Sequence, residues 1–231
     1  MHDRVVGAVA VLLAAVALAG GCVSGAPDVV LERSAGFDPP LELPAPDLIG
    51  ETTLEQVLIE RRSRRSFADT ELPLATIGQL FWAGQGISDG AGHRTAPSAG
   101  GLYPLELYAV TASHLLHYLP DGHRLEQRSN GNALVDLSAA AFRQEWVSSA
   151  PVVLVVAGVV SRTEAEYGAA ADDLVNLEAG HATQNVLLQA TALGLAATPV
   201  GGFDPDAARE LLALPPDHEV LYLVPVGEPS P

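Results

Sequence analysis

Residues 61–67 read RRSRRSF and place four arginines within five positions, on both sides of Ser63. The 231-residue chain has 12 basic side chains, all of them arginine, against 28 acidic ones, a net charge of −16. Because this charge repels anions from most of the surface, an anionic group would be held only where arginines concentrate. The arginine cluster (Arg61, Arg62, Arg64 and Arg65) is therefore either a phosphate-binding fork or a solvated basic turn.

Composition limits the possible functions. Hydrophobic residues make up 48% of the chain and charged residues 17%, as is typical of a globular protein, and the length fits one domain. The acidic charge argues against nucleic acid as a partner. The absence of lysine excludes a Walker A loop, a pyridoxal-phosphate Schiff base and a lysine nucleophile.

The N-terminus has the features of an export signal. An apolar run from Val5 to Leu18 is too short for a comfortable membrane span, and LAGGC then leads into Cys22, the only cysteine. This ending is similar to a bacterial lipobox, although leucine lies four residues before the cysteine rather than three. We expect a signal peptide at residues 1–21 and a lipid on Cys22 that anchors an exported protein to the membrane of the cell envelope. An uncleaved signal anchor is the alternative.

Residues 22–50 are rich in proline, glycine and acidic residues, which predicts a linker before a domain at residues 51–231. A helix should begin in TTLEQVLIERR, where Thr52 and Glu55 have the spacing of a capping box and Leu54, Val57 and Leu58 form an apolar face.

Helices and strands then interleave, which predicts an α+β fold with a mixed sheet. We expect further helices at 74–83, at 132–142, at 169–193 and after Asp204, strands at 105–110, 150–160, 197–200 and 219–226, and a hairpin at 114–128. In the long helix, Leu174, Leu177, His181, Leu188 and Ala192 lie near one face, which places His181 in the core or in an interface. His114 and His117 point to opposite faces of a strand, so no metal site is expected.

Two glycine-containing stretches, PSAGG at 97–101 and PVGG at 199–202, would let backbone amides approach a flat ligand closely. Along the chain the motifs come in the order RRSRRSF, FWAGQGI, PSAGG, EAGHATQNVLLQATALGL and PVGG. In this order they resemble the nitroreductase-like FMN-dependent oxidoreductases, most closely the SagB-type (thiazole/oxazole-forming) dehydrogenases. The resemblance runs from Thr52 to Pro229. It implies a homodimer with a nitroreductase-like fold, in which helices flank the central sheet and FMN binds at the subunit interface.

The resemblance also implies roles for individual residues. The FMN phosphate and ribityl chain would be held by Arg61, Arg62, Ser63 and Arg65. The flavin ring would pack against Pro97, Ser98, Ala99, Gly100 and Gly101. Its other side, near N5, would be covered by Pro199, Val200, Gly201 and Gly202.

The chain departs from the SagB-type pattern where azoline-oxidising members have a lysine–tyrosine pair, since Glu166 and Tyr167 stand there. Basic residues usual after this pair and near the C-terminus are also missing, which suggests weaker FMN binding. We expect Tyr167 to transfer protons in a reductive reaction with a small molecule. The alternatives are a degenerate member that binds a ligand or partner without redox turnover, and a peptide azoline dehydrogenase.

The lipidation of Cys22 predicts that labelled palmitate enters the wild-type protein in a bacterial host and does not enter Cys22→Ala, because the thiol is the acceptor. Equal labelling of the two proteins would exclude Cys22 as the lipidated residue.

Overall fold

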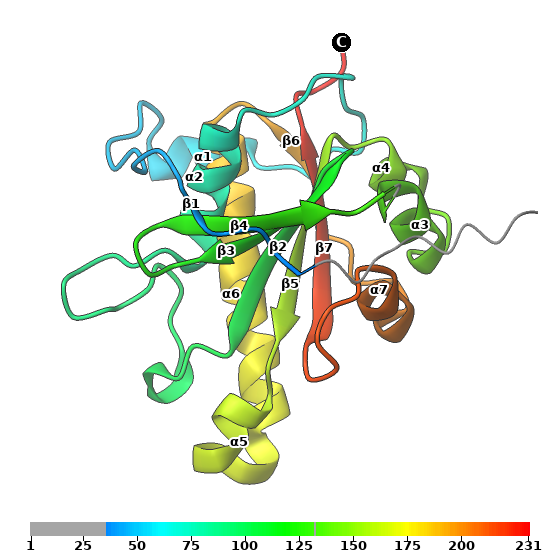
Figure 1. Ribbon diagram of the computed structural model, residues 1–231. Helices are drawn as coiled ribbons and strands as arrows, with labels where there is room; N and C mark the ends of the chain where they lie inside the picture. The colour runs from blue at the N-terminus through cyan, green and yellow to red at the C-terminus, as the bar shows by residue number, and fades with distance from the viewer. Residues whose placement is uncertain (1–35, 132) are drawn as a thin grey trace, which may run out of the picture. The chain divides into compact units, whose positions relative to one another are not determined.

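The fold is built on a seven-stranded sheet with the strand order β1-β4-β3-β2-β5-β7-β6 (Figure 1). The computed structural model describes residues 36–131 and 133–231, so the expected signal peptide and Cys22 lie outside the described part. The strands are β1 (Leu41–Glu42), β2 (Leu105–Val110), β3 (His114–Leu119), β4 (Arg124–Ser129), β5 (Val152–Gly158), β6 (Ala196–Ala197) and β7 (Glu219–Gly227). Neighbouring strands all pair antiparallel, and a single parallel bridge joins Ser63 to Ala197.

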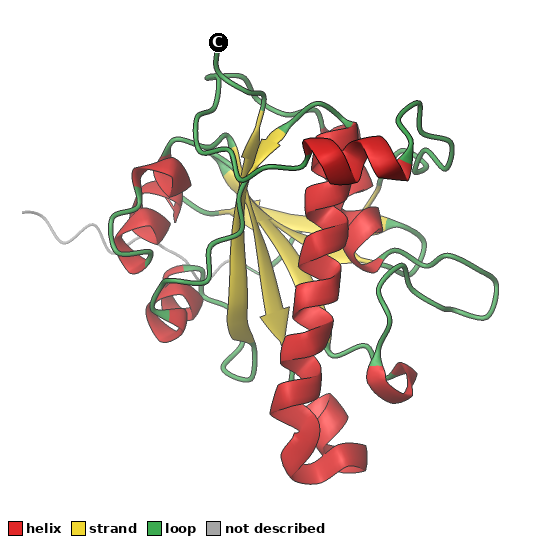
Figure 2. Cartoon of the chain, turned by 180° about the vertical axis from the view of Figure 1, so that it is seen from behind, coloured by secondary structure: helices red, strands yellow, loops and turns green. Residues whose placement is uncertain are grey.

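Helices cover both faces of this sheet, which confirms the predicted α+β fold. They are α1 (Leu54–Glu60), α2 (Leu74–Gln85), the short η1 (Ala99–Gly101), α3 (Ala133–Ala140), α4 (Glu145–Ser148), α5 (Ser161–Tyr167), η2 (Gly168–Ala170), α6 (Ala171–Ala192) and α7 (Pro205–Leu211). Figure 2 shows α6 lying across one face, and α3 and α7 lie on the other. No helix in the described ranges is long and apolar enough to cross a membrane.

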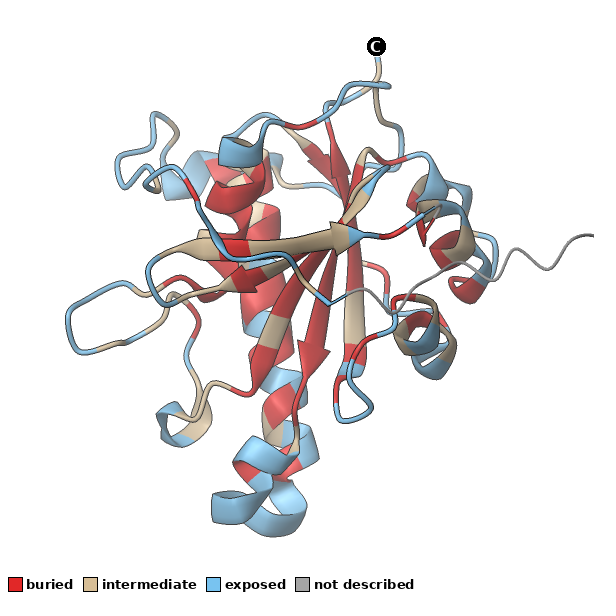
Figure 3. Cartoon of the chain, in the orientation of Figure 1, coloured by how far each residue is buried: buried red, intermediate tan, exposed pale blue. Residues whose placement is uncertain are grey.

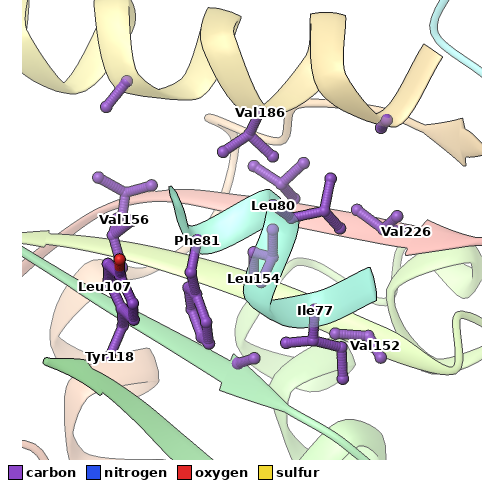
Figure 4. Close-up of a cluster of buried hydrophobic side chains, with 14 of the residues drawn as sticks. Ile77, Leu80, Phe81, Leu107, Tyr118, Val152, Leu154, Val156, Val186 and Val226 are labelled. Atoms are coloured by element: carbon purple, nitrogen blue, oxygen red, sulfur yellow. The ribbon is translucent and has the colours of Figure 1, made fainter. Parts of the chain in front are cut away.

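The central strand β5 is apolar along its whole length because both of its faces are covered. With the two-residue period of a strand, Leu154 and Val156 enter the core beneath α2 and α6, whereas Val153 and Val155 enter the core beneath α3 and α7. Figure 4 shows the first core, where Phe81 of α2 reaches the sheet and stacks on Tyr118 with ring centroids 5.0 Å apart.

Helix α6 packs closely on α2 through small side chains. Ala179, Ala182 and Ala190 are fully buried, and a Cβ added to Gly84 of α2 would lie 2.9 Å from Leu107 and 3.2 Å from Val186. A side chain at position 84 would therefore require the Leu107 and Val186 side chains to shift.

The buried face of α6 is not the face that the sequence pattern suggested. Leu177 is 61% exposed and His181 is exposed, so the interpretation of His181 as a core residue is wrong. The buried face carries these alanines together with Val175, Val186 and Leu187. Figure 3 shows buried residues concentrated in the central strands and exposed ones along parts of α6.

Two further expectations near the N-terminus need correction. The cap of α1 is Thr53, which exchanges hydrogen bonds with Gln56, and not Thr52 with Glu55. Of the expected apolar face only Val57 is buried, while Leu54 and Leu58 are 60% and 53% exposed.

The second half of the expected linker contacts the domain. β1 pairs with β4, and Leu43 is buried. The amide of Asp47 donates to Gln79 Oε1 at 2.8 Å, and Gln79 Nε2 donates to the Asp47 carbonyl at 2.9 Å. The folded part of the chain thus includes residues 37–47.

A half-buried ionic cluster lies on strands β2, β3 and β4. The two ring nitrogens of His117 bond Glu106 at 2.8 Å and Glu126 at 2.9 Å, and Arg162 of α5 bonds the other oxygen of Glu106 at 2.5 Å. Burial alone would raise the pKa of Glu106, but the hydrogen bonds from His117 and Arg162 outweigh burial and lower it to about 2. The same two carboxylates raise the pKa of His117 against the effect of its burial.

These shifts predict an acid-sensitive contribution to stability. A carboxylate with a lowered pKa stabilises the fold above its unfolded-state pKa of about 4.3, and the contribution disappears as the pH falls towards 2. For Glu106 this contribution to the free energy of unfolding is on the order of 3 kcal/mol. We expect Glu106→Gln to lower the free energy of unfolding by about that amount at pH 6, and the two proteins to converge near pH 2 in urea titrations.

Glu42→Gln is the matched control, since Glu42 is an exposed carboxylate on β1 of the same sheet. A constant difference between wild type and Glu106→Gln from pH 6 to pH 2 would contradict the assignment.

Candidate functional site

The arginine cluster lies beside the strand that leads to PVGG. Helix α1 ends at Glu60, and the chain then runs parallel to β6, where the amide of Arg64 donates to the carbonyl of Ala197 at 3.0 Å. Two of the predicted site stretches are thereby joined by backbone pairing.

The arginine side chains in this cluster have no carboxylate partner among residues 36–131 and 133–231. Arg61 is half-buried and the other three are exposed. Arg62 turns back and donates to the carbonyls of Ile59 and Arg61 at 2.7 and 2.8 Å, and Arg65 lies over the ring of Trp146 at 5.3 Å. Within the described ranges, no carboxylate forms an ion pair with any of the four. The cluster is therefore a concentration of positive charge on an acidic protein.

The PVGG stretch is fixed at Val200 and open at its glycines. Val200 is buried and exchanges backbone hydrogen bonds with Leu223 at 2.8 and 3.1 Å. Gly201 and Gly202 are exposed, and a Cβ added to Gly201 would meet no atom within 4 Å. The carbonyl of Gly202 accepts from Gln144 Nε2 at 2.6 Å. This arrangement leaves a rigid backbone surface that a flat ligand can approach.

The glycine loop (residues 97–103) lies elsewhere and is accompanied by Tyr167. Gly100 and Gly101 have positive φ angles of 61° and 66°, and Tyr103 has a φ of 48°. A Cβ added to Gly100 would lie 3.1 Å from the hydroxyl of Tyr167, which ends α5 and is 37% exposed. The structure thus brings the candidate proton-transfer residue to the glycine loop.

The sequence analysis missed a polar network beneath this loop. Glu178 of α6 is only 3% exposed and accepts from Gln85 Nε2 at 3.3 Å. Arg94 donates to Gln85 Oε1 at 2.9 Å. Burial raises the pKa of Glu178, and the hydrogen bonds and the charge of Arg94 offset only part of that rise. The sequence could have indicated the burial of Glu178, because this residue lies four positions before Ala182 and so on the same face of α6.

Within one chain the two groups of site residues are far apart. The arginine cluster and PVGG lie beyond the C-terminal end of α6, whereas the glycine loop and Tyr167 lie near its N-terminal end, and Figure 1 shows β6 and α5 at these opposite ends. The 14 residues from Glu178 to Ala192 alone rise by about 21 Å along the helix. Within one chain the predicted site residues therefore form two separate groups.

The chain belongs to the nitroreductase family, whose sequence model matches residues 58–228. This membership makes it an oxidoreductase. A candidate nitroreductase of Methanocaldococcus jannaschii is 36% identical over 193 residues, which cover 81% of this chain and 96% of that protein.

Solved structures confirm the nitroreductase-like fold. A candidate nitroreductase from Ralstonia eutropha has a TM-score of 0.76 and 27% identity, over 83% of this chain and 90% of that chain. The NADPH:FMN oxidoreductase from Vibrio harveyi, solved with NAD⁺, has a TM-score of 0.59 and 22% identity, over 77% of this chain and 68% of that one. At this identity the second likeness shows the fold alone.

Replacement of Gly100 and of Gly101 by alanine should destabilise the fold to different extents. Alanine at either position must adopt a left-handed conformation, which costs about 1–2 kcal/mol, but only at Gly100 does the added methyl also crowd Tyr167. We expect Gly100→Ala to lower the free energy of unfolding more than Gly101→Ala, as measured by urea denaturation.

Tyr167→Phe removes the nearest atom and should narrow this difference between the two alanine variants. If both alanine variants lost the same free energy of unfolding, and Tyr167→Phe left these losses unchanged, Tyr167 would not pack on Gly100.

Proposed function

We propose that the protein is a homodimeric, FMN-dependent oxidoreductase that transfers a hydride or two electrons between the flavin and a small molecule. The observation that carries the proposal is the separation of the two partial sites at opposite ends of α6. Two stretches that sandwich one planar ring lie about 7 Å apart, because each is in van der Waals contact with it. The glycine loop and PVGG of one chain are too far apart to do so.

A second copy supplies the missing half. A two-fold axis across the exposed face of α6 would place the N-terminal end of one helix beside the C-terminal end of the other, and would form two equal sites. Exposed apolar side chains on this part of the surface, Leu177 on α6 and Leu54 and Leu58 on α1, favour a covering partner.

The residues present fit a flavin phosphate. Arg61, Ser63 and Arg65 offer guanidinium and hydroxyl donors without competing carboxylates, and charge-assisted bonds of this kind select phosphate. The stacking of Arg65 on Trp146 holds one guanidinium in place. The name of the Vibrio harveyi relative supports FMN as the cofactor.

When bound, FMN supplies the ring that carries the hydride. The protein's own groups bind and orient it: the arginine cluster holds the phosphate, and PVGG and the partner's glycine loop confine the ring. Tyr167 is positioned at the loop to give a proton to a reduced substrate. Since Glu166 replaces the lysine of azoline-oxidising SagB-type relatives, we assign a reductive reaction to this member, with a quinone or nitroaromatic compound as acceptor.

We further propose that it works as an exported protein anchored by a lipid on Cys22.

The absorbance spectrum of the purified protein, with and without added FMN, tests the assignment. Retained flavin that is reduced by a chemical donor and reoxidised by a quinone supports it. A protein that takes up no flavin at micromolar FMN is a degenerate member that binds another ligand.

If the arginine cluster holds the FMN phosphate, Arg61→Ala should weaken the binding of FMN much more than that of riboflavin. One charge-assisted contact contributes about 1.5–3 kcal/mol, so the FMN dissociation constant should rise by roughly 10- to 150-fold, with little change for riboflavin, which has no phosphate. Flavin fluorescence titration measures both ligands. Arg209→Ala, which removes an arginine paired with Asp206 on α7, is the control for loss of charge alone.

A mixing experiment tests the shared site in the same assay. Arg61→Ala and Gly100→Val damage different halves of the proposed shared site. In each heterodimer both changes fall in one of the two sites, so the other site is intact. A one-to-one mixture after subunit exchange should recover about a quarter of the wild-type sites. No recovery, although heterodimers form, would place both halves in one subunit.

A further inference from the structure

The carboxylate of Glu106 is held in one orientation by the ionic cluster on the sheet. Its Oε2 atom lies 2.8 Å from Nε2 of His117, and Nδ1 of the same ring lies 2.9 Å from Glu126. Carboxylates only accept hydrogen bonds, so the imidazole donates at both nitrogens and cannot turn without losing a bond. The second oxygen of Glu106, Oε1, thereby stays directed at Arg162 of α5, which donates to it at 2.5 Å.

Arg162 connects this fixed carboxylate to the glycine loop. One nitrogen of its guanidinium bonds Glu106, and the other donates to the carbonyl of Tyr103 at 3.4 Å. Tyr103 is the last residue of the loop and has a left-handed φ of 48°, which a non-glycine residue adopts only when its surroundings impose it. Because the arginine fork is planar and rigid, it suits two acceptors at set positions. Arg162 thus joins α5 to β2 and to the end of the loop.

Helix α5 is held only weakly by burial of its side chains. The amide of Val159 donates to the carbonyl of Pro104 at 2.9 Å before the helix begins, and Ala171 is buried where α6 begins. Between these two points, residues 161–170 are all exposed except Thr163. Figure 3 shows this exposed segment at the end of the long helix. The direction of α5 therefore depends on the bonds that Arg162 makes to the sheet and to the loop.

Tyr167 lies at the other end of α5 and contacts the middle of the glycine loop. A Cβ added to Gly100 would lie 3.1 Å from the hydroxyl of Tyr167 and 3.3 Å from its ring. Helix α5 thus meets the loop at two points, with Arg162 at the end of the loop and Tyr167 at its middle. The contact of Tyr167 is one of packing, and the side chain is 37% exposed, so the directional bonds of Arg162 determine where the phenol lies.

We propose that Arg162 is a positioning residue, which fixes the direction of α5 through Glu106 and the Tyr103 carbonyl and so holds Tyr167 against the glycine loop. The part of this inference that concerns proton transfer to a substrate rests on the proposed function. Arg162 itself bonds only the sheet and the loop, and it acts on the reaction through Tyr167.

Three variants isolate the contribution of the guanidinium. Arg162→Met removes both donors and keeps an unbranched stem of similar length. Arg162→Lys keeps a positive charge beside Glu106 but replaces the fork by a single nitrogen, so it should restore only part of the attachment. Arg124→Met is the matched control, because Arg124 of β4 also donates to a backbone carbonyl, that of Asp121 at 3.0 Å, but within its own hairpin turn.

Hydrogen–deuterium exchange of the flavin-free, full-length protein measures the attachment without relying on activity. Loss of a partly exposed, charge-assisted attachment should speed exchange of the peptides covering residues 98–104 and 160–168 by roughly 3- to 10-fold in Arg162→Met. The acceleration should be smaller in Arg162→Lys and absent in Arg124→Met. Wild-type exchange of both peptides in Arg162→Met, or equal acceleration in Arg124→Met, would overturn the role of Arg162.

Quinone reduction by the flavin-loaded protein shows whether Arg162 acts through Tyr167. Arg162→Met should lower kcat no further than Tyr167→Phe does, and the double variant should match Tyr167→Phe, because no phenol hydroxyl is then left to position. A double variant slower than Tyr167→Phe by the full effect of Arg162→Met would overturn the action through Tyr167. Faster exchange of the two peptides in a protein that takes up no FMN supports the attachment and rejects the proposed cofactor instead.

Discussion

The close packing of α6 against α2 and the sheet is the constraint on which the other features depend. Ala179, Ala182 and Ala190 of α6 are fully buried there, and a Cβ added to Gly84 of α2 would lie 2.9 Å from Leu107 and 3.2 Å from Val186. Helix α6 is thereby held in place, and each of its ends lies near one group of the predicted site residues. The distance between the arginine cluster and the glycine loop is set by the length of this helix and not by the loops themselves.

The same packing explains what could be predicted from the sequence. β2 was expected at the positions where it is found, and α2 and β7 nearly so, because their apolar residues recur with the period of a strand or a helix. In α6 the pattern contains two candidate faces, one with Leu174, Leu177 and Leu188 and one with the alanines and Leu187. The second face is the buried one, and its close approach to Gly84, about 100 residues away in the chain, is not visible in the local pattern.

Much of the candidate site could be located from local motifs, whereas its supporting network could not. RRSRRSF and PVGG each signal a backbone or charge property within a few residues. Glu178, Gln85 and Arg94 acquire their roles only from one another, across three separate elements. A buried carboxylate in a helix looks like a surface residue until the chain that carries its donor is placed beside it. The ionic cluster around His117 escaped notice for the same reason.

The clamp between Gln79 and Asp47 has a mechanical consequence. Tension on the chain before residue 36 would reach the domain first at Asp38, whose amide donates to the carbonyl of Gln127 on β4 at 2.8 Å, and then at β1 and Leu43. At Asp47, the Gln79 amide bonds the backbone with both of its ends and also donates to Gln189 of α6 at 3.3 Å. Force would thus be passed into β4, and at Asp47 into α2 and α6, before it could reach α1. The arginine cluster follows α1 and so lies behind all of these attachments along the chain.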